Sequence, residues 1–487
     1  MFNLDNPSLL RTHAFVNGDW CAGDAQKTFV VENPATGAVL AQVAELGATE
    51  TSRAIAAAAN AQVGWVQKTA KARSQLLRSW FDLVMQNQED LAQILTLEQG
   101  KPLAEARAEI AYGASYIEWF AEEAKRIYGD VIAPSIPEQR ILVIKQPVGV
   151  VAAITPWNFP CAMLARKIAP ALAAGCSIVA KPAAETPLSA LALAFLAQQA
   201  GIPAGVINIV TGKDSAAIGA ELTGNSLVRK LSFTGSTAVG KRLIQQCAAD
   251  VKRITLELGG NAPFIVFEDA DLDAAVTGAM VSKFRNAGQT CVCANRFYIQ
   301  RSIYEQFSEK LLAAMKALSV GNGMDAGVSL GPLISSAAMQ KVQTLVDDAV
   351  AKGARIGYQA VLDTKLTAQG NFYPPTLLLD VAPDAALTCQ EIFGPVAGLI
   401  PFDTDDEAIA LANNTEYGLA SYCYTRTATR IKQVSEKLET GMLGINTGIV
   451  SNEMAPFGGI KQSGWGREGS HYSLGDYLNI KYLCENF

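Results

Sequence analysis

The sequence predicts an α/β protein in which parallel sheets carry helices on both faces. The first observation is an alternation of β-branched, strand-like runs with helix-like runs from about residue 150 onward. The second is the length of 487 residues, which suffices for two or three domains. The third is the composition, 49% hydrophobic and 18% charged, which is typical of a globular chain with a large core.

The N-terminal part of the chain lacks this alternation. Residues 1–50 predict short strands and turns. Residues 49–128 predict helices, because apolar residues recur there at three- and four-residue spacing. The β-branched run of residues 141–154 predicts one long strand.

Two series of strands follow. In the first series, strands are predicted at 176–181, 206–210, 230–233 and 254–258, and helices at 187–200, 215–222 and 237–247. In the second series, strands are predicted at 264–267, 295–299, 376–379, 396–401, 419–424 and 441–446, with helical stretches between them. A last strand is predicted at residues 476–483, far from the other strands in sequence.

Charge and cysteine usage exclude several classes of protein. The net charge is −6, from 40 basic and 46 acidic residues that are well mixed, so neither nucleic acid nor an anionic membrane is an expected partner. The N-terminal residues show no signal peptide, and no apolar run is long enough to span a bilayer. The nine scattered cysteines form no C-x-x-C pair. We therefore expect a cytoplasmic protein in a reducing compartment, without a disulfide framework or zinc ribbon.

Histidine is almost absent. His13 and His471 are the only two in the chain, and both lie near its ends. A histidine-ligated metal site and a Cys–His or Ser–His hydrolase are therefore not expected. General base catalysis must come from a carboxylate, a lysine or a tyrosine, and we expect no metal.

Cys291 is the candidate nucleophile. It follows a Gly-Gln-Thr turn among small and polar residues, whereas Cys176 lies in an apolar run. A thiol in such surroundings is accessible, and backbone N–H groups can support its thiolate. The alternative is a small packing residue, which is the commoner role of a free cysteine.

Two glycine-rich segments are similar to known phosphate-binding motifs, and only the first is expected to bind phosphate. The segment from Gly235 to Arg242 follows a predicted strand and opens a helix, but Arg242 replaces the Mg²⁺-binding Ser or Thr of NTPase loops. It predicts a phosphate cradle for a dinucleotide; a simple tight turn is the alternative. The segment 464–469 fits G-x-G-x-x-G but follows no predicted strand, so we expect a flexible loop there.

Three further stretches carry polar residues at strand ends. Asn158 lies in a turn bracketed by prolines, where it could alternatively cap a helix. Glu257 ends an otherwise apolar strand, where burial requires a purpose or a partner; an exposed edge residue is the alternative. Glu391 opens a short turn before a strand.

Taken together, these stretches resemble the aldehyde dehydrogenase family. The resemblance runs through the chain in the family's order, and it is carried by Pro156-Trp-Asn-Phe-Pro, Lys181-Pro-Ala, Phe233-Thr-Gly-Ser, Leu256-Glu-Leu-Gly-Gly, Gly288-Gln-Thr-Cys, Glu391-Ile-Phe-Gly-Pro and Pro456-Phe-Gly-Gly-Ile-Lys-Gln-Ser-Gly. It implies an α/β fold with a Rossmann-type cofactor domain, an α/β catalytic domain and a small β extension for oligomerisation. The expected domains are 1–128 with 147–258 for the cofactor, 259–465 for catalysis, and 129–146 with 466–487 for a dimer or tetramer.

The resemblance also assigns catalytic roles. It implies that the Cys291 thiolate attacks an aldehyde carbon and that the Asn158 amide and the Cys291 backbone N–H bind the oxyanion. Hydride transfer to a nicotinamide leaves a thioester, and Glu257 activates the water that hydrolyses it.

The resemblance also implies which residues bind the cofactor. Those implied are Thr155, Trp157, Lys181, Ala184, Gly235, Ser236, Gly240, Glu391 and Phe393. A glutamate at the position of Ala184 would repel a 2′-phosphate, so alanine beside Lys181 predicts that NADP is preferred and NAD is possible. The neighbouring Glu185 complicates this if the loop shifts.

Within the family, the chain most resembles succinate-semialdehyde dehydrogenases. Arg166, Arg285 and Ser451 carry this resemblance and imply an aldehyde with a distal carboxylate, which arginine can bind in bidentate fashion. Ion pairs are the alternative role for the arginines. Glutarate semialdehyde, a broader aldehyde range, a Cys-dependent esterase and a non-enzymatic role remain open.

Cys293 suggests redox control. In an extended segment, residues two apart point to the same side, so Cys291 and Cys293 could face one another. A disulfide between them would stop catalysis reversibly. The alternative is that Cys293 only packs beside the site.

Overall fold

The computed structural model describes residues 2–487. The first of its two large sheets confirms the predicted parallel α/β arrangement: β9, β8, β7, β10 and β11 are parallel neighbours, and antiparallel strands close both edges. In spatial order the strands are β2 (Asp19–Cys21), β1 (Ala14–Val16), β9 (Ile207–Ile209), β8 (Ser177–Lys181), β7 (Val150–Ile154), β10 (Val228–Thr234), β11 (Arg253–Glu257) and β21 (Gly464–Trp465).

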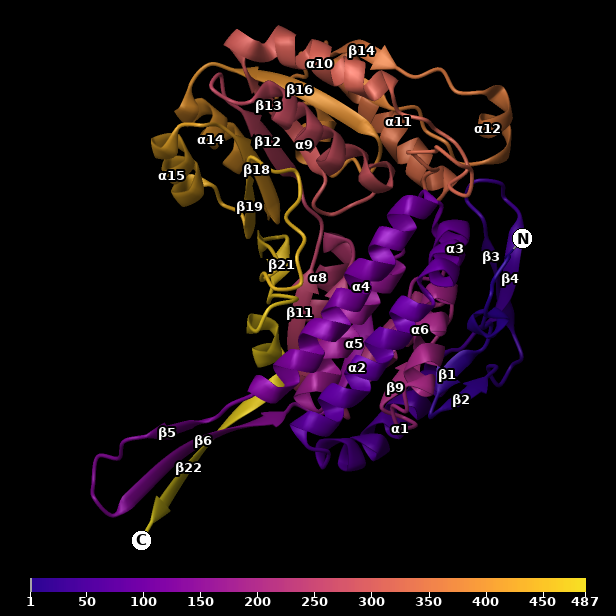
Figure 1. Ribbon diagram of the computed structural model, residues 1–487, viewed down its shortest axis with the longest axis vertical. Helices are drawn as coiled ribbons and strands as arrows, with labels where there is room; N and C mark the ends of the chain where they lie inside the picture. Colours follow the sequence, from indigo (N-terminus) through magenta and orange to yellow (C-terminus); the bar gives the residue numbers. More distant parts are fainter. Residues whose placement is uncertain (1) are drawn as a thin grey trace.

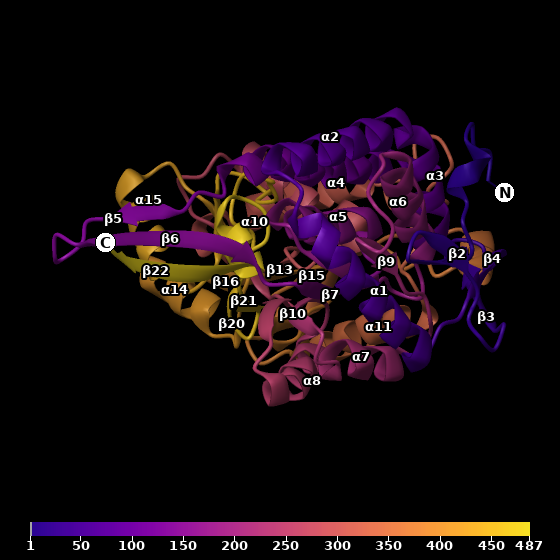
Figure 2. The ribbon, with the colours of Figure 1, turned by 90° about the horizontal axis from the view of Figure 1, so that it is seen from below.

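Helices cover both faces of this sheet (Figures 1 and 2). One face carries α2 (Ala70–Gln86), α3 (Gln88–Gln99), α4 (Leu103–Glu123), α5 (Pro160–Ala174) and α6 (Pro187–Gln199). The other carries α1 (Ala48–Val66), α7 (Ser215–Gly224) and α8 (Thr237–Cys247). Successive residues of a strand point to opposite faces of the sheet. Ala153 and Ile178 therefore belong to the first hydrophobic core, under α2–α6, and Ala152 and Val179 belong to the second, under α1, α7 and α8.

The second large sheet belongs to the later half of the chain. In spatial order its strands are β14 (Arg355–Gln359), β15 (Thr376–Leu379), β16 (Val396–Phe402), β13 (Ala294–Gln300), β12 (Ala262–Val266), β18 (Ala420–Tyr424) and β19 (Met442–Ile445). Its helices are α9 (Leu272–Phe284), α10 (Tyr304–Lys316), α11 (Ser336–Ala351), α12 (Thr364–Gln369), α13 (Ala386–Cys389), α14 (Asp405–Asn413) and α15 (Ala428–Lys437). Four short strands form two separate antiparallel pairs: β3 (Thr28–Glu32) with β4 (Val39–Ala44), and β17 (Tyr417–Gly418) with β20 (Ile460–Lys461).

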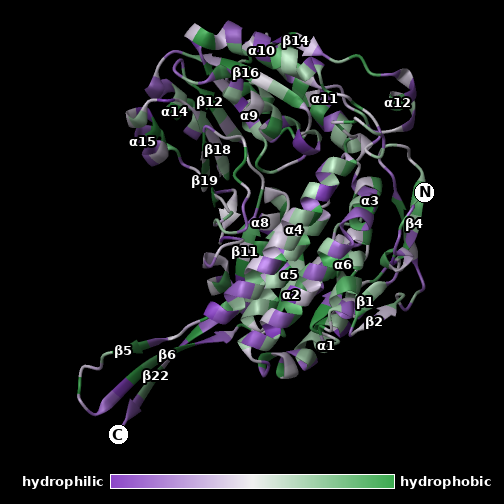
Figure 3. Ribbon diagram, viewed as in Figure 1, coloured by the Kyte–Doolittle hydropathy of each residue, from purple (hydrophilic) through white to green (hydrophobic). Residues whose placement is uncertain are grey.

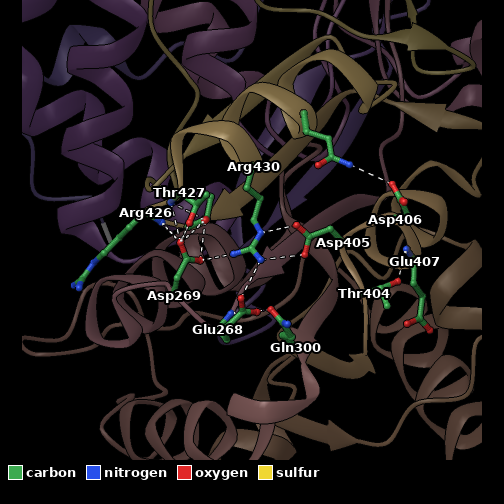
Figure 4. Close-up of polar contacts among 12 residues, drawn as sticks. Glu268, Asp269, Gln300, Thr404, Asp405, Asp406, Glu407, Arg426, Thr427 and Arg430 are labelled. Atoms are coloured by element: carbon green, nitrogen blue, oxygen red, sulfur yellow. Dashed lines mark hydrogen bonds and ion pairs between the residues drawn. The ribbon is translucent and has the colours of Figure 1, made fainter.

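A polar cluster holds the outer edge of this second unit together (Figure 4). The Arg430 guanidinium on α15 donates to Glu268 at 2.9 Å, Asp269 at 2.7 Å and Asp405 at 2.7 Å. Burial raises the pKa of Asp269, but hydrogen bonds from Thr427 and its neighbours outweigh it and bring this pKa down to about 2. The cluster therefore joins α14 and α15 to the segment that directly follows β12.

A third, three-stranded sheet protrudes from the molecule (Figure 1). It joins β5 (Asp130–Ile132), β6 (Gln139–Pro147) and the C-terminal β22 (Leu478–Asn486). Figure 3 shows hydrophobic residues along it, and Val131, Ile480 and Tyr482 are 81%, 74% and 60% exposed.

Three expectations about this fold are wrong. The run 141–154 is not one strand: it divides into β6 and β7, which lie in different sheets. β6 ends at Pro147, which lacks an N–H group, and Gly149 has a φ of 117°, so the backbone turns before β7 begins. The predicted loop at 464–469 begins with β21, which pairs with β11. The last strand begins at Leu478, because residues 472–477 form a short 3₁₀ helix in the first core.

None of the helices in the described part of the chain combines the length and the apolar composition needed to cross a membrane.

Candidate active site

A cavity of about 300 Å³ lies at the carboxyl ends of β7 and β10. The chain order of the strands reverses here, since β8 lies beside β7 on one side and β10 on the other; ligands commonly bind at such a point. The predicted site residues that line the cavity are Trp157, Asn158, Arg166, Gly235, Ser236, Arg285, Cys291, Glu391, Phe393 and Ser451. Those that do not line it are Thr155, Lys181, Ala184, Gly240, Glu257 and Cys293.

Cys291 lies in the turn between α9 and β13 and is partly exposed to the cavity. Burial raises the pKa of its thiol to about 12, and the positive charge of Arg166 acts in the opposite direction. The thiol is therefore the resting form. The thiol must lose its proton before the sulfur can act as a nucleophile.

Asn158 follows β7 and precedes α5. Phe159 is the residue that caps α5, so Asn158 does not serve as a helix cap. The Asn158 amide nitrogen donates to the Gln289 carbonyl at 2.9 Å, and its oxygen is buried without a partner. The amide has a second N–H and lies in the cavity wall with Cys291. It can therefore donate to an oxyanion formed there.

Glu257 ends β11 and is 2% exposed, so it is not an exposed edge residue. Neither oxygen of its carboxyl has a hydrogen-bond partner. Burial raises the pKa of this carboxyl well above its usual range, the Glu468 carboxylate raises it further, and Arg166 lowers it. A carboxyl with a raised pKa can take up a proton near neutral pH, as a general base must.

The buried ion pairs of Glu468 were missed by sequence reasoning. Glu468 follows β21, and its carboxylate pairs with Arg166 and Lys167 of α5. Lys167 also donates to Ser232 at 3.1 Å. The available signal was a glutamate inside the glycine-rich segment 464–469, which the expectation of a loop concealed.

Arg166 is fully buried, yet its guanidinium retains binding capacity. Its centre lies 4.4 Å above the Phe457 ring, and its Nη1 and Nη2 atoms have no hydrogen-bond partner. Arg285 and Ser451 line the same cavity, and Arg285 lies 5.3 Å from the Phe159 ring. Two cations and a hydroxyl therefore meet in the cavity that contains Cys291.

The glycine turn after β10 fits a phosphate group. A Cβ on Gly235 would lie 2.5 Å from the Phe233 ring, and a Cβ on Gly240 would lie 2.6 Å from Leu258. Glycine at these positions therefore leaves room for the Phe233 ring at the turn and for the Leu258 side chain against α8. Ser236 caps α8 by accepting from the backbone of Val239, and the helix N-terminus faces the cavity.

Buried hydroxyl groups beside this turn lack partners. They are Thr155 Oγ1 after β7 and Thr234 Oγ1 at the end of β10. Lys181 ends the neighbouring β8; burial lowers the pKa of its amine, and the Glu185 carboxylate raises it. Ala184 is half-buried three residues further on. These residues share the carboxyl edge of one sheet, so they fit an extended dinucleotide.

The opposite wall of the cavity carries the residues expected at a nicotinamide. Burial raises the pKa of Glu391 to about 7, and Lys341 on α11 lowers it. Lys341 also lines the cavity and was missed, because it lies in an ordinary helical stretch. Phe393 has a φ of 58°, and its ring meets Trp157 edge-on at 5.5 Å. Backbone strain of this kind gathers at ligand sites.

Cys293 lies behind the cavity wall. The expected extended backbone is wrong, because residues 291–292 form a turn in which the Cys293 N–H donates to Thr290. The Cys293 thiol is 7% exposed and lies 3.5 Å from the Lys283 carbonyl. A disulfide with Cys291 stays a prediction, and it would require this turn to rearrange.

Comparison with known proteins identifies the family of the chain. The model of the aldehyde dehydrogenase family matches residues 20–483. The chain is 58% identical over 481 residues to a glutarate-semialdehyde dehydrogenase of Pseudomonas putida, which covers 99% of each chain. It is 57% identical over 482 residues to an NADP⁺ succinate-semialdehyde dehydrogenase of Escherichia coli, again covering 99% of each. The solved structure of succinate-semialdehyde dehydrogenase from Burkholderia pseudomallei superposes with a TM-score of 0.98 at 57% identity, covering 100% of both chains. The chain belongs to the aldehyde dehydrogenase family.

Proposed function

We propose that the protein oxidises succinate semialdehyde to succinate with NADP⁺ through covalent catalysis by Cys291. The observation that carries the proposal is the free pair of guanidinium nitrogens of Arg166 in the cavity that contains Cys291. A distal carboxylate could accept from both nitrogens, with Arg285 and Ser451 completing its binding site. The aldehyde group of the bound semialdehyde would then lie in the same cavity as the Cys291 sulfur.

The residues of the chain divide the reaction between them. The Cys291 thiol loses its proton to solvent, and the thiolate attacks the aldehyde carbon. The Asn158 amide donates to the oxygen that becomes negative. A bound nicotinamide dinucleotide supplies the acceptor for the hydride. Glu257 then takes a proton from the water that hydrolyses the thioester on Cys291.

Replacing Glu257 by glutamine separates these steps. We expect one equivalent of reduced cofactor per active site, followed by turnover slower by about 10²–10⁴-fold, because acylation remains but hydrolysis lacks its base. The measurement is stopped-flow absorbance at 340 nm. A steady rate within threefold of that of the native enzyme would contradict the role of Glu257.

The raised pKa of Glu257 also predicts a pH dependence. The carboxylate is the active form, so kcat should fall as the pH falls through this raised pKa, and the Glu257→Gln variant should lack this limb. A native profile that stays flat down to pH 5 would contradict it.

NADP⁺ preference is supported by Ala184, which leaves room beside Lys181 for a 2′-phosphate, and by the cofactor named for the Escherichia coli relative. Replacing Ala184 by glutamate should shift the ratio of kcat/KM for NADP⁺ over NAD⁺ at least about tenfold toward NAD⁺, since the carboxylate repels the phosphate. Ala184→Gln, of the same size but neutral, is the control. An equal shift in both variants would mean that size, not charge, sets the preference.

A panel of aldehydes tests the whole proposal. Succinate semialdehyde, glutarate semialdehyde and butanal are each assayed with NADP⁺ and NAD⁺ at 340 nm, and a p-nitrophenyl ester is assayed without cofactor. The proposal expects the highest kcat/KM with succinate semialdehyde and NADP⁺. A higher kcat/KM with glutarate semialdehyde would make that aldehyde the substrate instead. It is a close alternative, because one additional methylene group changes binding only weakly. Ester hydrolysis without aldehyde oxidation would favour the esterase.

The protruding sheet of β5, β6 and β22 supports the proposal of a homo-oligomer. Its exposed apolar residues would be costly in a monomer, and they suit a surface that a second copy covers. Light scattering in solution distinguishes a monomer, a dimer and a tetramer.

A further inference from the structure

Lys101 is a buried lysine that the proposed reaction does not use. It lies between α3 and α4, and its side chain is completely buried. Its ammonium group donates to Glu109 at 2.5 Å and to the backbone carbonyl of Asn158 at 2.8 Å. It also lies 3.8 Å above the Phe159 ring. All three partners are on or beside the segment that presents the Asn158 amide to the cavity.

Two carboxylates of α4 extend this contact to both sides of the site. The second oxygen of Glu109 accepts from the backbone N–H groups of Cys161 at 3.0 Å and Ala162 at 3.3 Å, in the first turn of α5. Glu105 accepts from the backbone N–H of Asn286 at 2.7 Å. Helix α4 therefore holds both the start of α5 and the segment that precedes Cys291.

The backbone held by Glu105 is strained. Asn286 has a φ of 51° and Ala287 a φ of 54°, in the left-handed region that residues with a Cβ rarely adopt. The Asn286 amide donates at 2.9 Å to the same Asn158 carbonyl that Lys101 contacts. Two donors therefore fix the peptide plane after Asn158, and its side-chain amide is anchored to Gln289.

We propose that Lys101 is a positioning residue, which holds the Asn158 amide in the geometry that stabilises the oxyanion on the substrate. The inference rests on the proposed function, because the oxyanion forms only in carbonyl chemistry. The Phe159 ring contacts both Lys101 and Arg285, so a change at Lys101 can also reach Arg285. A buried ion pair often stabilises a fold no better than apolar residues of the same shape, so stability alone does not account for this one.

The test removes the charge pair without leaving one charge buried. In the double variant Lys101→Met with Glu109→Gln, the glutamine oxygen can still accept from Cys161 and Ala162. We expect kcat for succinate semialdehyde with NADP⁺ to fall about 30–100-fold, while the Kd of NADP⁺ stays within twofold. In an Asn158→Ala background, the same double change should cost less than threefold, because the group that Lys101 positions is already gone.

A chemical readout separates positioning from general damage. Iodoacetamide alkylates a thiol without forming an oxyanion, so its rate with Cys291 should stay within twofold in the double variant. The matched control is Lys252→Met with Asp250→Asn. Lys252 is also buried and donates to one carboxylate and one backbone carbonyl. It lies just before β11, at the end of this strand that is away from Glu257. This control should keep native kcat.

Lys101→Arg is the second variant, should the double variant fold poorly, because it keeps the charge pair with Glu109. The larger guanidinium moves the donor that contacts the Asn158 carbonyl, and we expect a three- to tenfold loss of kcat with the same dependence on Asn158. Equal losses in the native and Asn158→Ala backgrounds would overturn the inference, as would a parallel fall in alkylation rate or an unchanged kcat. A native enzyme that oxidises no aldehyde would instead overturn the proposed function, and the inference with it.

Discussion

Replacing Cys291 by alanine is expected to lower kcat for aldehyde oxidation on the order of 10⁴-fold or more, since covalent catalysis loses its nucleophile. Cys291 is the cysteine that lines the cavity among residues 2–487. Cys293 lies behind the wall against the Lys283 carbonyl and cannot replace it. The change removes one sulfur from a cavity wall, so the fold and the binding of NADP⁺ should remain.

The measurement is the initial rate at 340 nm, together with the thermal midpoint and the Kd of NADP⁺. Cys293→Ser is the matched control: it also removes one thiol from the same turn, and we expect less than a threefold change in kcat. Activity of the Cys291→Ala variant within tenfold of native would refute the nucleophile. Loss of NADP⁺ binding would show that the cavity itself had collapsed.

The parts of the site that the sequence predicted are those that local motifs carry. Asn158 and Gly235 follow β7 and β10, so their places at the carboxyl edge follow from the alternation of strands and helices. Cys291 lies in a turn before β13, and its Gly-Gln-Thr motif marks that turn in the sequence. The strand boundaries in this region were correct to within a few residues, because buried parallel strands are continuous apolar runs.

What the sequence did not predict depends on pairing between distant segments. Glu468 lies 301 residues from its partner Lys167, and nothing local to either residue indicates the contact. Glu109 and Lys101 are close in sequence, yet their meeting with Asn158 depends on how α4 packs against α5. The sheet that β6 joins likewise depends on β22, which arrives from the far end of the chain.

The arginines of the cavity give the second large prediction. Arg285→Met should lower kcat/KM for succinate semialdehyde about 100-fold, mainly through KM, and that for butanal less than threefold. Arg285 has no carboxylate partner within ion-pair distance in the described chain, so its charge is available to a substrate. A hydrogen bond to a charged group contributes about 1.5–3 kcal/mol, which corresponds to roughly 10–150-fold in affinity. Methionine keeps an apolar stem against Phe159.

Arg166→Met provides the comparison that separates substrate binding from structure. Arg166 already pairs with Glu468, so its loss leaves that buried carboxylate with Lys167 alone and should also lower the thermal midpoint and kcat. Arg285→Met should change neither by much. The distinguishing substrate is butanal, which has the same four carbons without the carboxylate. If Arg285→Met reduces kcat/KM equally for both aldehydes, Arg285 shapes the cavity rather than binding the distal carboxylate, and the proposed carboxylate site loses one of its two cations.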